Sequence, residues 1–97
     1  MQSHVVKTQD IYESAYLLTQ GANILNVEAL HENSKLICAF TFSGENLLEA
    51  QNEYYNARAQ VNLWEFRRCF NRINSLIGTA RKEFKQRETS SAGEVSL

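Results

Sequence analysis

The chain has 97 residues, of which 43% are hydrophobic and 22% charged, a composition typical of one globular domain. It has no apolar run near the roughly 20 residues that span a bilayer, and its first ten residues, MQSHVVKTQD, lack the basic start and apolar segment of an export signal. We therefore expect a cytoplasmic protein without a membrane partner. The two cysteines, Cys38 and Cys69, lie in apolar stretches without metal-type or redox-type spacing, which predicts reduced, buried thiols.

The net charge of −1 conceals an uneven distribution along the chain. Residues 1–57 carry two basic and seven acidic side chains, a net charge of −5, whereas residues 58–87 carry eight basic and two acidic ones, a net charge of +6. Two explanations are open. The acidic and basic parts either face each other, within the fold or across a dimer, or the basic part forms a surface for an anionic partner.

The first predicted elements are a short strand in HVVK and a helix in TQDIYESAYLLTQG. Thr8 is the expected N-cap of this helix, and Asp10 lies in its first turn, where a negative charge is favourable. Apolar residues recur at Ile11, Ala15 and Leu18 on one face. Gly21 is expected to end the helix because glycine tolerates the left-handed conformation found there.

Residues 24–42 alternate in the manner of a β-hairpin. We take HENS as a four-residue loop, which sets Leu30 opposite Lys35. In this register one face of the hairpin is fully apolar and the other mixed, as expected for a sheet covered on one side. The residues predicted on the apolar face are Leu25, Val27, Ala29, Leu36, Cys38 and Phe40.

Two further helices follow the hairpin. The first, in SGENLLEAQNEYYNAR, is expected to be capped by Ser43. The second opens at NLWE with a capping-box-like Asn62 and Glu65, and runs to about Ile77 or, past Gly78, to Phe84. Residues 1–86 are thus predicted to form a single domain, and residues 87–97, RETSSAGEVSL, a polar tail.

The order of these elements predicts an α+β fold. Its centre is a small antiparallel three-stranded sheet in the order β-α-β-β-α-α, with helices packed on one face.

The stretch YYNARAQVNLWEFRRCF, residues 54–70, combines aromatic and basic side chains and requires a choice between core and binding surface. At 100° per residue the apolar side chains of the third helix fall on one stripe, and Arg68 and Arg72 point away from it. Trp64 lies near the border of the solvent face. The predicted stripe is Leu63, Phe66, Phe70, Ile73 and Ile77. The possible interaction surface is Tyr55, Arg58, Trp64, Arg67, Arg68 and Arg72.

The sequence provides no basis for a catalytic or cofactor site. His4 and His31 are isolated, and neither HxxxH nor CxxC spacing occurs, so no metal site is predicted. The four glycines are scattered and form no phosphate loop. An enzyme is not excluded, but we predict no cofactor and assign no catalytic residue.

Two stretches resemble a family of small bacterial and archaeal domains, domain of unknown function 5659. They are KTQDIYESAYLLTQGANILNVE and YYNARAQVNLWEFRRCFNRINSLI, which together cover residues 7 to about 77. The resemblance implies a prokaryotic intracellular protein and supports the segment boundaries, but implies no function. Ala57 stands where that family usually has glycine, so we expect Asn56 to adopt the left-handed conformation at this turn.

Our leading hypothesis is a non-enzymatic protein-interaction module that forms a homodimer or higher oligomer. Arg68 or Arg72 of one copy would face Glu49 or Glu53 of another, and the sheet edges could also pair. The alternative is nucleic-acid binding by the third helix through Arg67, Arg68 and Arg72, with Arg58 and Arg81 as flanking phosphate contacts. Against the alternative stands the isoelectric point of about 6.1.

Overall fold

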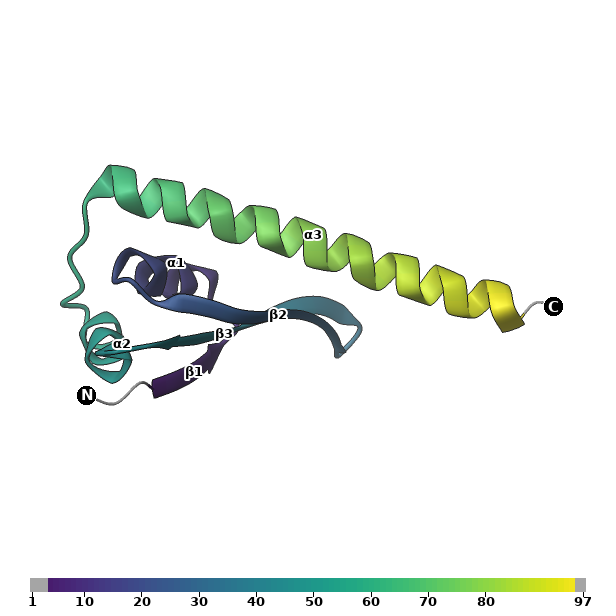
Figure 1. The fold of residues 1–97 in the computed structure, drawn as a ribbon, viewed down its shortest axis with the longest axis horizontal. Coiled ribbons are helices and arrows are strands. Elements are labelled where there is room, and N and C mark those ends of the chain that lie inside the picture. The colour runs from purple at the N-terminus through teal and green to yellow at the C-terminus, as the bar shows by residue number, and fades with distance from the viewer. Residues whose placement is uncertain (1–3, 96–97) are drawn as a thin grey trace.

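The computed structural model describes residues 4–95, with side chains described for residues 4–87. Within this range the chain forms a three-stranded antiparallel sheet in the order β1-β3-β2 and three helices (Figure 1). The predicted α+β fold and element order are confirmed. The elements are β1 His4–Thr8, α1 Ile11–Thr19, β2 Asn23–Glu32, β3 Lys35–Gly44, α2 Leu47–Tyr55 and α3 Leu63–Val95.

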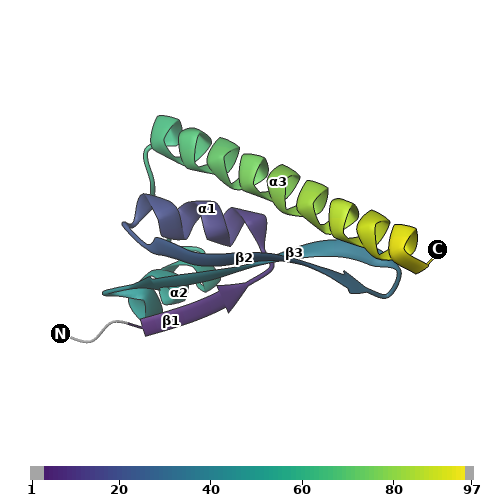
Figure 2. The ribbon, with the colours of Figure 1, turned by 45° about the vertical axis from the view of Figure 1, so that its right-hand side comes forward.

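One face of the sheet packs against the helices and forms the core. Phe40 and Phe42 of β3 are fully buried at its centre, and the helices contribute Leu17, Leu47 and Ile73 to the same cluster. α3 covers α1 and then continues along the β2–β3 hairpin (Figures 1 and 2). Each layer thus buries its apolar side against the other, which is why this short chain forms a single core.

Among the described elements, no helix packs on the opposite face of the sheet. There the Lys7 ammonium of β1 lies 2.9 Å from the Glu28 carboxylate of β2, reaching across β3. Ala39 of β3, whose side chain lies on this face, is nevertheless buried. The exposed pair therefore shields a small apolar side chain, which is the usual way in which one-sided sheets meet water.

The hairpin turn is shorter than predicted. Glu32 pairs with Lys35, so the loop consists of Asn33 and Ser34 alone, with φ of 52° and 66°. Two consecutive positive φ values are the mark of a type I′ turn, which matches the twist of the flanking strands. The predicted pairing of Leu30 with Lys35 is wrong by two residues. From residue 26 onward, a shift of two leaves each side chain on its predicted face.

Leu25 is the exception to the predicted facing. A β-bulge lies between Ile24 and Asn26, which pair with Phe42 and Thr41, so Leu25 has no partner on β3. Its side chain is 57% exposed, and Ile24 takes its place on the core face. Hydrophobic alternation cannot reveal this inserted residue, because a bulge changes the period locally.

The predicted N-terminal cap of α1 is wrong, and its predicted C-terminal glycine is correct. The N-cap is Asp10 and not Thr8, because the Asp10 side chain accepts hydrogen bonds from the backbone N–H groups of Tyr12 and Glu13. At the other end Gly21, with φ of 89°, follows the last turn as predicted. The N–H groups of Gly21 and Ala22 donate to the carbonyls of Leu18 and Leu17, a Schellman motif.

The predicted start of α2 and the turn after it are both corrected. Ser43 belongs to β3, and α2 starts three residues later than expected, after Asn46, whose side chain makes no cap hydrogen bond. After α2, Ala57 itself adopts the left-handed conformation, with φ of 57°, while Asn56 has φ of −93°. The left-handed position of this turn is therefore Ala57 and not Asn56.

α3 is the longest element and shapes the molecule. It runs to Val95 and thus continues beyond Phe84, where the apolar periodicity ends, into the stretch expected to be a tail. The molecule is accordingly elongated, with extents of 54 × 29 × 22 Å. In Figure 1 the first turn of α3 and the whole of α2 lie at one end, and the hairpin tip lies toward the other end.

Candidate interaction surface

The first turn of α3 exposes large apolar side chains. Asn62 caps the helix as predicted, since its Oδ1 accepts hydrogen bonds from the N–H groups of Trp64 and Glu65 at 3.0 and 3.2 Å. Leu63 is 77% exposed and Trp64 is 73% exposed, with the partly exposed Val61 just before them. Leu63 was predicted to be core, and this is wrong, because the helix begins beyond the elements that would cover it (Figure 1).

One turn further, α3 packs onto α1 through stacked rings. Phe70 stacks on Tyr12 of α1 with ring centroids 5.3 Å apart, and Phe66 stacks on Phe70 at 6.0 Å. Both phenylalanines are half-buried, and Ile73 is fully buried below them. The aromatic side chains of residues 66–70 are therefore packing residues, as the sequence predicted, and belong to no binding surface.

The arginines of α3 lie on its solvent side. The Arg67 guanidinium lies 5.6 Å from the centre of the Trp64 ring, a cation–π contact at the exposed end of the helix. Arg68 and Arg72 are exposed, and within residues 4–87 neither has a carboxylate within 4.0 Å. The Glu65–Arg68 pair that their spacing allows is not formed. We call Val61, Leu63, Trp64 and Arg67 the helix-end patch.

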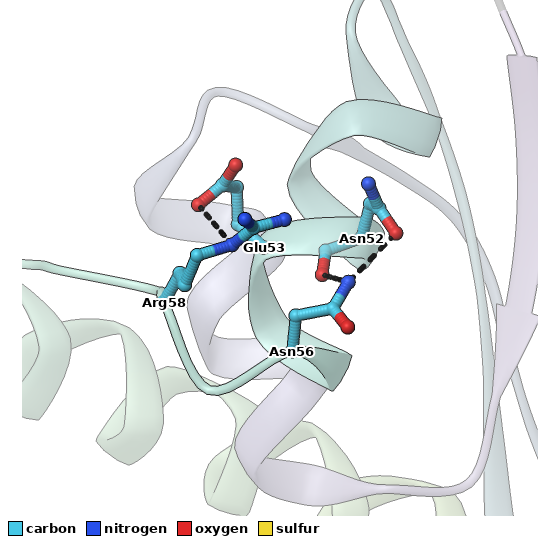
Figure 3. A network of polar contacts seen from close by, with 4 residues as sticks. All are labelled: Asn52, Glu53, Asn56 and Arg58. Carbon is cyan, nitrogen blue, oxygen red and sulfur yellow. Dashed lines mark hydrogen bonds and ion pairs between the residues drawn. The ribbon is translucent and has the colours of Figure 1, made fainter.

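Arg58 does not join the arginines of α3. Its Nε lies 3.9 Å from a carboxylate oxygen of Glu53, at the end of α2 (Figure 3). Beside it, the Asn56 amide donates to the backbone carbonyl and the side-chain oxygen of Asn52. Arg58 therefore lies beside Glu53 at the end of α2 and not beside Arg68 and Arg72 of α3.

Three glutamates of α2 and its approach form an acidic stripe, Glu45, Glu49 and Glu53, spaced four residues apart. They line a groove of about 310 Å³ together with Tyr16 and Gln20 of the neighbouring α1 segment. Burial, and then the charge of Glu53, raise the pKa of the Tyr16 hydroxyl. Glu49 and Glu53 were predicted to face the arginines of another copy, and the groove adds Glu45 to them.

A buried polar network joins α1 to α2, and sequence reasoning missed it. Glu13 is fully buried, and its carboxyl oxygens accept hydrogen bonds from Thr8 at 2.6 Å, Gln51 at 2.9 Å and Tyr55 at 2.8 Å. Tyr54 donates to Asp10, the N-cap, at 2.8 Å. The adjacent tyrosines thus fasten α2 to α1 through their hydroxyls. The ring of Tyr55 is exposed, whereas its hydroxyl group is hydrogen-bonded to Glu13.

This network shifts the ionisation of both tyrosines. Burial, with the hydrogen bond to Asp10 and the nearby carboxylates, raises the pKa of Tyr54 to about 12. The hydrogen bond to Glu13, with burial, raises the pKa of Tyr55. The fold therefore favours the neutral phenols, because a phenolate would meet a carboxylate where a donor is required.

We expect the protein to lose stability at alkaline pH through Tyr54. A hydroxyl whose pKa rises from about 10 when unfolded to about 12 when folded stabilises the fold fully below pH 10, and this contribution is lost as the pH passes 12. Urea midpoints measured between pH 9 and 12 should fall, and the Tyr54→Phe variant should show a shallower decline. Tyr12→Phe is the control, because within the described residues the Tyr12 hydroxyl has no hydrogen-bond partner. An equal decline in all three proteins would contradict this assignment.

The described residues were also compared with the requirements of a metal site and of a membrane-spanning helix. Over the residues described, no group of three or more His, Cys, Asp or Glu side chains is placed to hold a metal ion. In the same range no helix combines the length and the apolar character needed to cross a membrane. Cys38 is buried and Cys69 half-buried, both as free thiols. No protein-family model, no curated protein and no solved structure matches this chain.

Proposed function

We propose that this protein is a non-enzymatic interaction module that associates with a second copy of itself. The observation that carries the proposal is that two oppositely charged surfaces, the acidic stripe and the arginines in the first half of α3, do not pair with each other within the described residues. The acidic stripe of α2 and the pair Arg68 and Arg72 of α3 both repeat at four-residue spacing. Glu53 pairs with Arg58 and Glu28 pairs with Lys7, and no carboxylate of the described residues 4–87 lies within 4.0 Å of Arg68 or Arg72.

The arrangement suits a two-fold symmetric contact. In such a dimer the acidic stripe of each copy lies against the arginines of the other, so every contact forms twice. The helix-end patch, which lies between these surfaces along the chain, supplies exposed apolar area of the composition found at binding hot spots, tryptophan and arginine above all. Charge complementarity would then set the orientation and the apolar patch would contribute affinity.

The resemblance noted above and the free thiols support placing this module in the cytoplasm of a prokaryotic cell. The only fully buried acidic side chain described, Glu13, is closed to solvent and saturated with donors. It is therefore a structural group that joins α1 to α2.

Charge-swap variants test this proposal. Arg68→Glu with Arg72→Glu makes both surfaces acidic, and Glu45→Lys with Glu49→Lys makes both basic. We expect sedimentation velocity to show self-association of the wild type, weakened at least about tenfold in each variant. A one-to-one mixture of the two variants should associate again, because each contact is then opposite in sign. A wild type that stays monomeric at every concentration, or a mixture that fails to associate, would refute the proposal.

A second candidate function, nucleic-acid binding, is favoured by one observation. On α3 no acidic residue occurs between Glu65 and Glu83, and the solvent side there presents Arg68, Arg72 and Lys82. Phosphate contacts of this kind predict an affinity that falls steeply between 50 and 200 mM salt. Anisotropy of a labelled DNA duplex would detect such binding, and the Arg68→Glu/Arg72→Glu variant should abolish it. The Glu45→Lys/Glu49→Lys variant keeps both arginines, so it should still bind DNA although it should not associate with itself. This difference separates the two functions.

A further inference from the structure

The outer edge of β2 is open. β2 pairs with β3 on one side only, and within the described residues no element pairs with its other side over Asn23–Glu32. The edge of β3 beyond β1 differs, because Arg81 of α3 donates to the Leu36 carbonyl there at 3.4 Å. Proteins usually cover or interrupt a long free edge, because it is a template for another strand.

The backbone groups that β2 presents at this edge follow from the turn. In a hairpin with a two-residue loop, the flanking pair, Glu32 and Lys35, exchanges both backbone hydrogen bonds, and such pairs alternate along the ladder. Leu30 and Glu28 therefore bond to β3. The N–H and C=O groups of Val27, Ala29 and His31 point outward and are available to an added strand.

A groove follows the same edge. It has a volume of about 850 Å³ and is lined by residues 26–30 of β2 and by Phe84 and Arg87 of α3. Phe84 is half-buried and its ring lies 5.0 Å from that of His31, so it forms an apolar wall. Arg87 is exposed, and no carboxylate in the described part of the chain lies within 4.0 Å of it.

We propose that this groove binds an extended segment of a partner protein, which adds to β2 as a fourth strand. Its backbone would pair with Val27, Ala29 and His31. Side chains two residues apart on a strand face the same side, so an apolar residue would lie against Phe84 and an acidic residue two positions away would pair with Arg87. The bound motif is therefore an apolar residue, any residue, and then aspartate or glutamate, or the reverse order.

A second copy of β2 does not meet this requirement. In a symmetric antiparallel pairing of two β2 strands, the side of the sheet that faces α3 is shared by both copies. The β2 side chains on that side in the groove region are Val27, Ala29 and His31, since their partners on β3 are Phe40, Cys38 and Leu36. None is a carboxylate, so Arg87 would remain unpaired.

The test uses two labelled peptides, STDTLTDTS, which carries the motif in both orders, and the same sequence with lysine in place of both aspartates, and anisotropy at low salt. Wild type should bind the aspartate peptide at micromolar concentration and at least tenfold more tightly than the lysine peptide. Arg87→Glu should reverse this preference, and Arg72→Glu, with the same charge change about four turns earlier on α3, should leave it unchanged. Binding should also slow amide hydrogen exchange at Val27 and Ala29.

Equal binding of both peptides by wild type, no binding at millimolar peptide, or an unchanged preference in Arg87→Glu would each overturn the proposal. The Arg68→Glu/Arg72→Glu variant separates this inference from self-association, because it should fail to associate with itself and still bind the aspartate peptide. A protein that associates but binds neither peptide would refute the groove alone.

Discussion

Glu13→Ala is expected to lower the free energy of unfolding by about 2–4 kcal/mol. The substitution leaves three hydrogen-bond donors, from Thr8, Gln51 and Tyr55, without their acceptor, and opens a space in a fully buried position. An unpartnered buried polar group costs about 1–3 kcal/mol, and the lost packing adds to it. Urea denaturation monitored by circular dichroism measures the change.

Glu28→Ala is the matched control. Glu28 also forms a short contact, with Lys7 at 2.9 Å, but both side chains of that pair are substantially exposed. Exposed ion pairs contribute about 0–1 kcal/mol, so this variant should remain close to the wild type. If the two variants were destabilised equally, the Glu13 network would not be the connection between α1 and α2 that its geometry indicates.

The network also shows where sequence reasoning ended. A helix within residues 8–21 was predicted, yet in the sequence Glu13 looks like an ordinary first-turn acid on an amphipathic helix. Its burial depends on α2, which lies 34 residues later in the chain and brings Gln51 and Tyr55 over it. A one-dimensional pattern cannot show which polar side chains a distant helix will cover, because that depends on packing angles.

The β2–β3 hairpin, in contrast to the Glu13 network, was predicted in most of its features. Its strands and its apolar face were predicted because the period of two is a property of the strand itself. The loop length was wrong because Asn33 and Ser34 both adopt positive φ, and serine gives only a weak signal for that conformation. The open edge of β2 and the groove beside it could not be predicted either, since strand order in the sheet and the path of α3 beyond Phe84 decide both.

Ile73→Ala is expected to cost about 2–4 kcal/mol, while Leu63→Ala should change stability by less than about 0.5 kcal/mol. The periodicity of α3 places both residues on one apolar stripe, but Ile73 is fully buried and Leu63 is 77% exposed. Deleting buried methylene groups loses their transfer free energy and leaves a cavity. Truncating an exposed side chain loses little transfer free energy and leaves no cavity. Thermal and urea denaturation of the two variants compare these expectations directly.

The same pair of variants separates packing from association. Leu63 lies in the helix-end patch, so Leu63→Ala should weaken self-association in sedimentation experiments while the monomer keeps its stability. Ile73→Ala holds the patch unchanged and loosens the attachment of α3 to the core. If Leu63→Ala destabilised the monomer as much as Ile73→Ala, α3 would begin inside the core. The exposed end on which the proposed association depends would then not exist.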